Sequence, residues 1–188
     1  MKSYASALRL ALVLLALAYR PAARAAGTGE DLTPWNPCAG CNLLLGVGGT
    51  YKFWSSTDSA VVPIELEIDD SRWEIAAFRM TSGQLLDEPA TYPNTLYSAK
   101  PYWGFSAMRR WRILRRPWGK LYVGFGANYR TETDMLVALK WNFAYLIAYR
   151  VNLGDTPAFA EVSIRHWSDA WLRLPDRGQN LLVVSFGF

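Results

Sequence analysis

The segment 164–170, Ile-Arg-His-Trp-Ser-Asp-Ala, contains the residue types of a nucleophilic site. His166 is the one histidine among 188 residues, and Ser168 follows it two positions later. A serine hydroxyl becomes a nucleophile when a base accepts its proton, and imidazole is the side chain best suited to this near neutral pH. A third group should then orient the imidazole and fix its tautomer. His-x-Ser is also a common tripeptide, so the surrounding elements must decide whether the pair can react.

An alternation of period 2 surrounds this segment and predicts strands. Between positions 137 and 153 every odd position is apolar or aromatic, and the even positions are small or polar apart from Leu146. The same split recurs in 43–53 and 120–130, and further strands are expected at 61–68, 72–81, 101–113, 157–168 and 179–188. Pro63 and the pair Asp69-Asp70 make 61–81 the least regular part. About eight strands are the smallest closed barrel common in outer membranes, so the chain is interpreted as an all-β, eight-stranded antiparallel transmembrane β-barrel.

The first 25 residues have the layout of a cleaved signal peptide. A positive start is followed by the apolar run 10–19 and by Ala23-Arg24-Ala25, an A-x-A cleavage site. That run is too short for a transmembrane helix, which needs about 20 apolar residues. Residues 26–42 form an N-terminal segment with Cys38 and Cys41, and 43–188 form the barrel. In an exported chain this C-A-G-C pair favours a local disulfide over metal or redox chemistry.

The composition agrees with an exported barrel. Aromatic residues are 14% of the chain, with nine Trp and ten Tyr, and charged residues are 19%, below the usual ~25%. The net charge of +4 does not argue for nucleic acid and is compatible with an anionic surface such as lipopolysaccharide. A small porin is disfavoured because side chains normally fill the lumen of eight strands. No metal or organic cofactor is implied.

The two ends of such a barrel normally lie in the periplasm, which orients every loop. The connection 169–178 is then external, whereas the short Gly154–Pro157 turn and the basic stretch Arg109–Lys120 are periplasmic. The charges of that basic stretch are interpreted as a solvated turn rather than a binding patch. The last residues, Ser-Phe-Gly-Phe, end in Phe188, which resembles the signal that outer-membrane barrels present to their insertion machinery.

The alternation also predicts where the histidine points. His166 and Ser168 share a parity with Val162 and Ile164, so both are expected on the lipid-facing wall, at the external rim. Asn180 shares the outward parity of the last strand, beside them. Polar groups that face lipid are costly and are functional by default. The alternative is that His166 is an interfacial residue at headgroup level, with Trp167 as a belt aromatic.

The C-terminal third resembles the lipid A 3-O-deacylase (PagL) family. That family carries a His-x-Ser-Asn-Ala block, a Pro-Asn-x-Gly turn and an acidic residue leading into the last strand. The matching positions here are His166, Ser168, Asp169, Ala170, Pro175, Asp176, Gly178 and Asn180. The resemblance covers residues 119–188, and the first half agrees only in general layout.

The resemblance implies an eight-stranded barrel of the bacterial outer membrane that removes the ester-linked acyl chain at the 3 position of lipid A. A Ser-His-Glu triad on the membrane-facing wall would place Ser168 as nucleophile and His166 as general base. Two positions depart from the family: Asn180 replaces the triad acid, and Asp169 replaces an Asn of the oxyanion hole. Asp169 or Asp176 could instead orient His166, and a non-catalytic barrel that binds lipid or only maintains the wall is the alternative. The substrate's acyl chains are expected beside Val162, Ile164 and Leu182, and its headgroup near Arg173 or Arg177.

Overall fold

The computed structural model describes residues 40–51, 58–84, 98–134, 137–170, 172 and 178–188. The expected signal peptide, Cys38, Arg173, Pro175, Asp176 and Arg177 lie outside these residues. Ten strands occur in the described part: β1 Asn42–Thr50, β2 Ala60–Ile68, β3 Trp73–Met80, β4 Gly83–Gln84, β5 Ser98–Ala99, β6 Tyr102–Arg116, β7 Gly119–Arg130, β8 Trp141–Asn152, β9 Phe159–Ser168 and β10 Gln179–Gly187.

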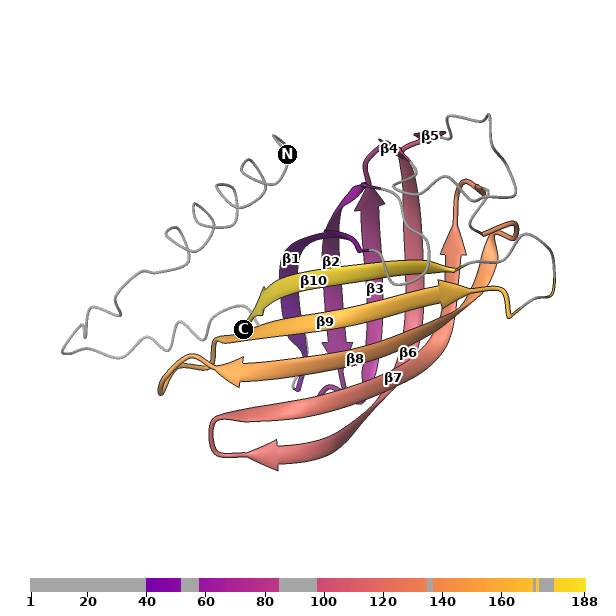
Figure 1. Cartoon of the computed structure of the whole chain (residues 1–188). Helices are drawn as coiled ribbons and strands as arrows, with labels where there is room; N and C mark the ends of the chain where they lie inside the picture. Colours follow the sequence, from indigo (N-terminus) through magenta and orange to yellow (C-terminus); the bar gives the residue numbers. More distant parts are fainter. Residues whose placement is uncertain (1–39, 52–57, 85–97, 135–136, 171, 173–177) are drawn as a thin grey trace, which may run out of the picture. The chain divides into compact units, whose positions relative to one another are not determined.

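Eight of the strands close into one antiparallel barrel, which confirms the predicted fold (Figure 1). The order around the barrel is β1-β10-β9-β8-β7-β6-β3-β2, and β4 pairs with β5 in a separate two-stranded sheet. β1 and β10 close the barrel in a register that runs from Leu44 opposite Gly187 to Thr50 opposite Leu181. The described part contains no helix long and apolar enough to cross a membrane.

The two ends of the barrel differ in their connections. At one end, here called the short-turn end, the connections are 69–72, 117–118 and 153–158. At the other, the long-loop end, they are 51–59, 81–101, 131–140 and 169–178. Outer-membrane barrels place short turns in the periplasm and longer loops outside the cell, which assigns the short-turn end to the periplasm.

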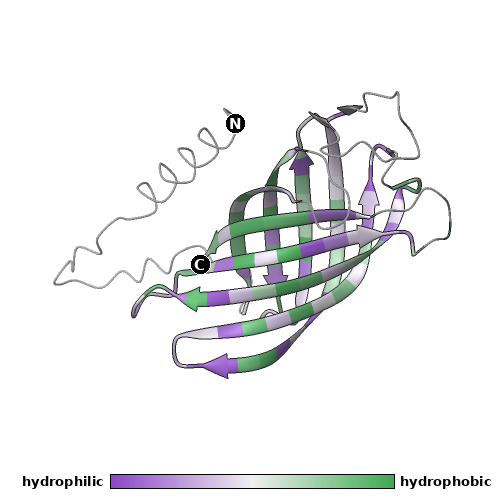
Figure 2. Cartoon of the chain, in the orientation of Figure 1, coloured by the Kyte–Doolittle hydropathy of each residue, from purple (hydrophilic) through white to green (hydrophobic). Residues whose placement is uncertain are grey.

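Alternating side chains give the barrel an apolar exterior and a mixed interior, visible as alternating colours along the strands (Figure 2). Large apolar side chains are exposed on the outward parity, among them Leu45, Ile64, Ile75, Phe105, Phe125, Phe143, Ile147, Val162, Ile164, Leu182 and Val184. Aromatic rings lie toward both ends of the outer wall, with Trp103 and Trp141 at the long-loop end and Trp73 and Trp118 at the short-turn end.

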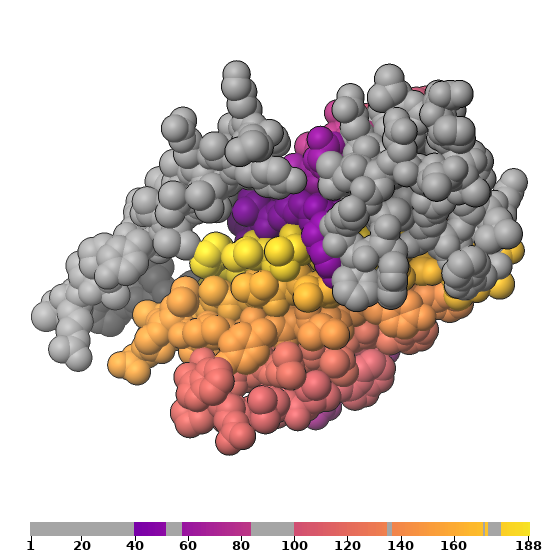
Figure 3. All heavy atoms as spheres, in the orientation of Figure 1, coloured from indigo at the N-terminus to yellow at the C-terminus, as the bar shows by residue number. Residues whose placement is uncertain are grey.

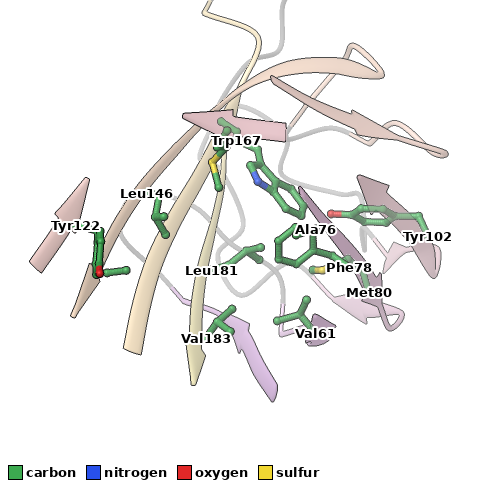
Figure 4. Packing of buried hydrophobic residues seen from close by; sticks show 13 residues of the cluster. Val61, Ala76, Phe78, Met80, Tyr102, Tyr122, Leu146, Trp167, Leu181 and Val183 are labelled. Carbon is green, nitrogen blue, oxygen red and sulfur yellow. The ribbon is translucent and has the colours of Figure 1, made fainter. Parts of the chain in front are cut away.

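One part of the lumen is filled by apolar side chains toward the long-loop end. Trp167 and Phe78 meet edge to face with ring centroids 5.1 Å apart, and Leu181 and Leu146 belong to the same buried cluster (Figure 4). Leu146 was the apolar exception on the polar face of its strand, and it is buried because that face looks into the lumen.

The other part of the lumen holds a network of buried ion pairs. Arg110, Arg150 and Arg165 contact four glutamates, Glu65, Glu67, Glu74 and Glu161, and all seven side chains are buried. A buried charge is tolerated only when it is paired and hydrogen-bonded. A lumen filled by these side chains gives no support to the porin alternative.

Several predicted boundaries were wrong. β8 begins at Trp141, not at position 137, because the backbone N–H of Val137 is bonded to the Asp134 side chain in the preceding turn. Arg110 was interpreted as part of a solvated turn, but it is buried in the lumen within β6. That strand continues to Arg116 through a register shift between Arg112 and Leu114.

The irregular stretch 61–81 does form two strands. Pro63 faces the lumen in β2 and pairs with Phe78 of β3. Proline lacks the N–H that a sheet ladder needs, and the β1–β2 pairing is correspondingly interrupted between Leu45–Ile64 and Gly48–Val61. The aspartate pair lies in the turn that follows β2, where Asp69, Asp70 and Ser71 all have positive φ. Cys41 is disulfide-bonded, as expected.

Candidate active site

The candidate site lies on the outer face of β9 and β10, at the long-loop end. His166 and Ser168 share the face of Val162 and Ile164, which are exposed, whereas the intervening Arg165 is buried in the lumen. Figure 3 shows the same side of the molecule, where β8, β9 and β10 form a continuous surface in orange and yellow. His166 and Ser168 therefore lie on the outward-facing side of β9, as the alternation of the sequence predicted.

His166 and Asn180 are opposite one another in the β9–β10 register. Nδ1 of His166 and Oδ1 of Asn180 are 2.8 Å apart. Because an amide oxygen only accepts, Nδ1 donates in this bond, and in the neutral imidazole Nε2 is then the unprotonated nitrogen. The Asn180 side chain is buried, and its Nδ2 has no hydrogen-bond partner within the described part of the chain.

Gly178 supports the other edge of the imidazole. It has φ +69°, and a Cβ placed on it would lie 2.9 Å from Nε2 of His166 and closer still to Cε1. The same Cβ would lie 3.1 Å from the carbonyl oxygen of Trp167. A glycine is therefore required here both by the backbone conformation and by the approach of the ring.

Ser168 is the last residue of β9 and is half-buried. Its hydroxyl oxygen accepts a hydrogen bond from the backbone N–H of Ala170 at 3.1 Å. Ala170 has φ +55°, so the chain turns sharply immediately after the serine. This local bond fixes the start of the β9–β10 connection next to the hydroxyl.

Asp169, the expected oxyanion-position or alternative orienting residue, is fully buried. Its backbone carbonyl accepts from the N–H of Leu172 at 3.2 Å, which continues the turn after Ser168. Asp176, the other alternative orienting residue, lies outside the described residues, as do Arg173 and Arg177. The structure thus brings His166 and Asn180 into contact and places Ser168 on their face.

Apolar side chains flank the site on both neighbouring strands. On β8, Tyr145 is the register partner of His166, and their ring centroids are 6.0 Å apart. The ring centroids of Phe125 and Tyr145 are 5.2 Å apart, so Phe125 extends this aromatic surface onto β7. One layer further toward the short-turn end, Ile164 lies between Ile147 of β8 and Leu182 of β10. An acyl chain lying along β9 would meet apolar side chains on every side.

The buried ionic network is the feature that sequence reasoning missed. Carboxylate oxygens of Glu65, Glu74 and Glu161 lie within 4.8 Å of one another, which is close enough to share a metal ion. Each of them, however, already accepts hydrogen bonds from Arg110, Arg150 or Arg165. The carboxylates therefore act as ion-pair partners of the three arginines. Charged residues at inward-facing strand positions were the signal that could have revealed the network.

Comparison with known proteins finds only distant structural likenesses. No family model matches the chain, and no curated protein matches it. Among solved structures it is similar to the outer membrane enzyme PagL, with 14% identity and a TM-score of 0.49, over 78% of this chain and 98% of that one. It is also similar to the outer membrane protein OprG from Pseudomonas aeruginosa, with 11% identity and a TM-score of 0.46, over 79% and 95% of the two chains. Neisserial surface protein A gives 10% identity and a TM-score of 0.46, over 79% and 96%.

The construction of the barrel determines its location. Its eight strands close, so every strand of the wall has a neighbour on both sides. The exterior exposes Ile64, Ile75, Ile147 and Ile164, side chains that favour hydrocarbon over water. The chain is a β-barrel of the bacterial outer membrane.

Proposed function

We propose that the chain is an esterase of the outer membrane that removes the 3-O-linked acyl chain of lipid A. The observation that carries the proposal is the 2.8 Å bond from His166 Nδ1 to Asn180 Oδ1, with Ser168 two residues along the same outer face. That bond leaves Nε2 of His166 able to accept a proton, which is the state a general base requires. The choice of lipid A as substrate rests on the resemblance of the C-terminal third to lipid A 3-O-deacylases.

The reaction follows from these residue types. Nε2 of His166 accepts the hydroxyl proton of Ser168 as Oγ attacks the ester carbonyl. The tetrahedral intermediate collapses, the sugar 3-oxygen leaves with the proton from His166, and the acyl group remains on Ser168. Water then attacks the acyl-enzyme, again giving its proton to His166, and the fatty acid leaves as Ser168 regains its hydrogen. The proposal requires Ser168 Oγ to lie within hydrogen-bond reach of Nε2 when substrate is bound.

Asn180 acts in this scheme as the residue that orients the base. Replacing the triad Asp by Asn in a serine protease costs about 10⁴ in rate because the histidine adopts the wrong tautomer. With Oδ1 facing Nδ1, a neutral imidazole carries its proton on Nδ1, which is the tautomer that the proposed reaction requires. What Asn180 lacks is the negative charge that would stabilise the imidazolium during the reaction. The expected enzyme is functional but slower than one with a carboxylate at this position.

The placement on the outer wall suits a substrate that is itself part of the membrane. Val162, Ile164 and Leu182 are between 43% and 46% exposed, next to the site on the face that meets lipid. A lipid A acyl chain can lie against them without leaving the outer leaflet. The ester, which lies at the boundary between acyl chains and headgroup, would then meet Ser168 at the long-loop end.

A non-catalytic barrel is the second candidate, and two observations favour it. Asn180 carries no charge, and Asp169, which is fully buried, matches the position that the resemblance assigns to the oxyanion hole, where an anion would be unfavourable. Such a protein would bind lipid A at the same surface without cleaving it.

The test is mass spectrometry of lipid A from cells that express the wild type, Ser168→Ala or Ser82→Ala. Ser82 is an exposed serine after β3, also at the long-loop end, and serves as the matched control. Loss of one 3-linked acyl chain is expected in the wild type and Ser82→Ala and not in Ser168→Ala. Unchanged lipid A in wild-type cells would show the esterase proposal to be wrong, and a lipid A that copurifies intact with the protein would favour the non-catalytic barrel.

A serine-reactive lipid phosphonate provides an independent measurement on purified protein. Labelling of Ser168 is expected in the wild type, and Asn180→Leu should label more slowly because its imidazole loses the orienting acceptor. Labelling at equal rates in His166→Ala and the wild type would contradict base catalysis by His166.

A further inference from the structure

The β6–β7 hairpin extends past β3 at the short-turn end, whereas its β7 strand stays paired with β8 as far as Gly119 opposite Val151. The last pairing between β3 and β6 is Trp73 with Arg109, supported by a bond from Arg110 N–H to the Arg72 carbonyl. Beyond it, residues 111–116 of β6 pair only with β7. Residues 111–118 are all exposed. We call residues 111–121 the basic hairpin; it projects at the lower left of Figure 1.

The outward face of the basic hairpin is apolar. Trp111, Leu114 and Trp118 are 47%, 39% and 63% exposed. Trp118 lies against Tyr149 of the outer wall, with ring centroids 5.9 Å apart. The apolar exterior of the barrel therefore continues onto this hairpin, at the depth where aromatic rings meet lipid headgroups.

Four side chains of the basic hairpin are cationic. Arg112, Arg115, Arg116 and Lys120 have no ion pair with the described carboxylates, in contrast to Arg110, which is ion-paired inside the lumen. Residues 100–131 contain no Asp or Glu at all. Arg115 is the register partner of Lys120, and Arg112 lies opposite the inward-facing Tyr122, so these three cations share the inward parity. Arg116 lies opposite Gly119 and has the outward parity of Leu114, on the same face as Trp111.

We propose that the basic hairpin binds the headgroup phosphate of an anionic phospholipid in the periplasmic leaflet. The hairpin carries cations on both faces, and Arg116 lies beside the apolar aromatic side chains of the outward face. A phospholipid offers the complement, a phosphate joined to acyl chains. Arg109, stacked on Trp73 at 5.0 Å, adds a cation on the outer wall just above the hairpin. An acidic soluble protein would match the charge but would leave the Trp111 and Trp118 face without a partner.

The test uses the full chain in detergent with equal amounts of phosphatidylglycerol and phosphatidylethanolamine, followed by native mass spectrometry of the retained lipid. The wild type is expected to retain the anionic lipid preferentially. In Arg115→Gln/Arg116→Gln the preference should fall about tenfold or more, since each basic residue near an anionic membrane surface contributes roughly a fivefold effect. The control is Lys100→Gln/Lys140→Gln, which removes the same charge from exposed positions at the long-loop end.

A second pair of variants examines the apolar face. Trp118→Ala should lower retention of phosphatidylglycerol, whereas Trp141→Ala, 67% exposed at the long-loop end, should not. Three results would overturn the proposal: equal retention of both lipids by the wild type, an equal loss in the two charge variants, or binding of polyglutamate at this hairpin with no lipid preference. None of them bears on the esterase site, which lies at the opposite end of the barrel.

Discussion

His166 and Asn180 face each other across β9 and β10, and the bond from Nδ1 to Oδ1 makes Nε2 the proton-accepting nitrogen of the imidazole. Asn180 thus supplies an acceptor that orients the imidazole, but without the charge of a carboxylate. It therefore separates two contributions of a triad acid that are usually combined, the tautomer and the electrostatic stabilisation of the imidazolium.

Asn180→Asp should increase the rate of lipid A deacylation. Asp has almost the shape of Asn, so Oδ1 can keep its position while the charge stabilises the imidazolium. A hydrogen bond to a charged group contributes about 1.5–3 kcal/mol, compared with about 1 kcal/mol for a neutral one. The expected gain is about tenfold, measured by mass spectrometry with purified lipid A in mixed micelles.

Asn180→Leu is the companion variant, in which the rate of deacylation should fall. It keeps the volume and removes the acceptor, so the imidazole loses both its orientation and its tautomer, and the rate should fall at least about tenfold. An unchanged rate in both variants would mean that Asn180 takes no part in the reaction. Thermal unfolding of each variant should be measured in parallel, because Asn180 is buried and its Asp carries a desolvation cost.

Gly178→Ala should abolish most of the activity while leaving the barrel folded. The added Cβ would contact both Nε2 and Cε1 of His166 and would displace the ring from its bond with Asn180. The control is Gly154→Ala, in the β8–β9 turn, because Gly154 has nearly the same φ, +67°, and nothing within 4 Å of the added Cβ. Both variants share a backbone cost of about 1–2 kcal/mol, so a difference in activity reports the displaced ring.

How far the sequence could predict this site depends on the range of the interactions. Period-2 parity alone placed His166 and Ser168 on the lipid-facing side, because alternation is a property of one strand. Parity wrongly extended the strand over residues 137–140, because alternation does not reveal that Val137 belongs to a turn. In that turn its N–H donates to the Asp134 side chain. The contact of Gly178 with His166 depends on how the β9–β10 connection folds back, and no periodicity encodes it.

Arg110 shows the limit most clearly. Within its own segment it is one of several basic residues, and a solvated turn was the natural interpretation. Its partners Glu67 and Glu161 lie 43 and 51 residues away in the sequence. They meet it only because the barrel closes, so the pairing could be recognised only after the strand order was known.

Arg110→Met should strongly destabilise the barrel. It removes the cation that contacts Glu67, Glu74 and Glu161 and leaves these buried carboxylates with less compensation. Breaking a buried ion pair from one side costs about 3–5 kcal/mol. The measurement is urea unfolding in lipid vesicles. Arg112→Met, two residues further along β6 and exposed, should have little effect, and equal losses in the two variants would argue against a stabilising role for the network.

Ile164→Trp should shorten the acyl chains that the protein accepts. Ile164 faces lipid between Ile147 and Leu182, one outward position from His166 along β9, where a bound chain would lie. A larger side chain there should reduce deacylation of long-chain lipid A more than that of short-chain lipid A. The matched control is Ile75→Trp, because Ile75 is similarly exposed on β3, four strands away around the barrel. If the two variants cleave all chain lengths alike, the acyl chain does not lie along β9.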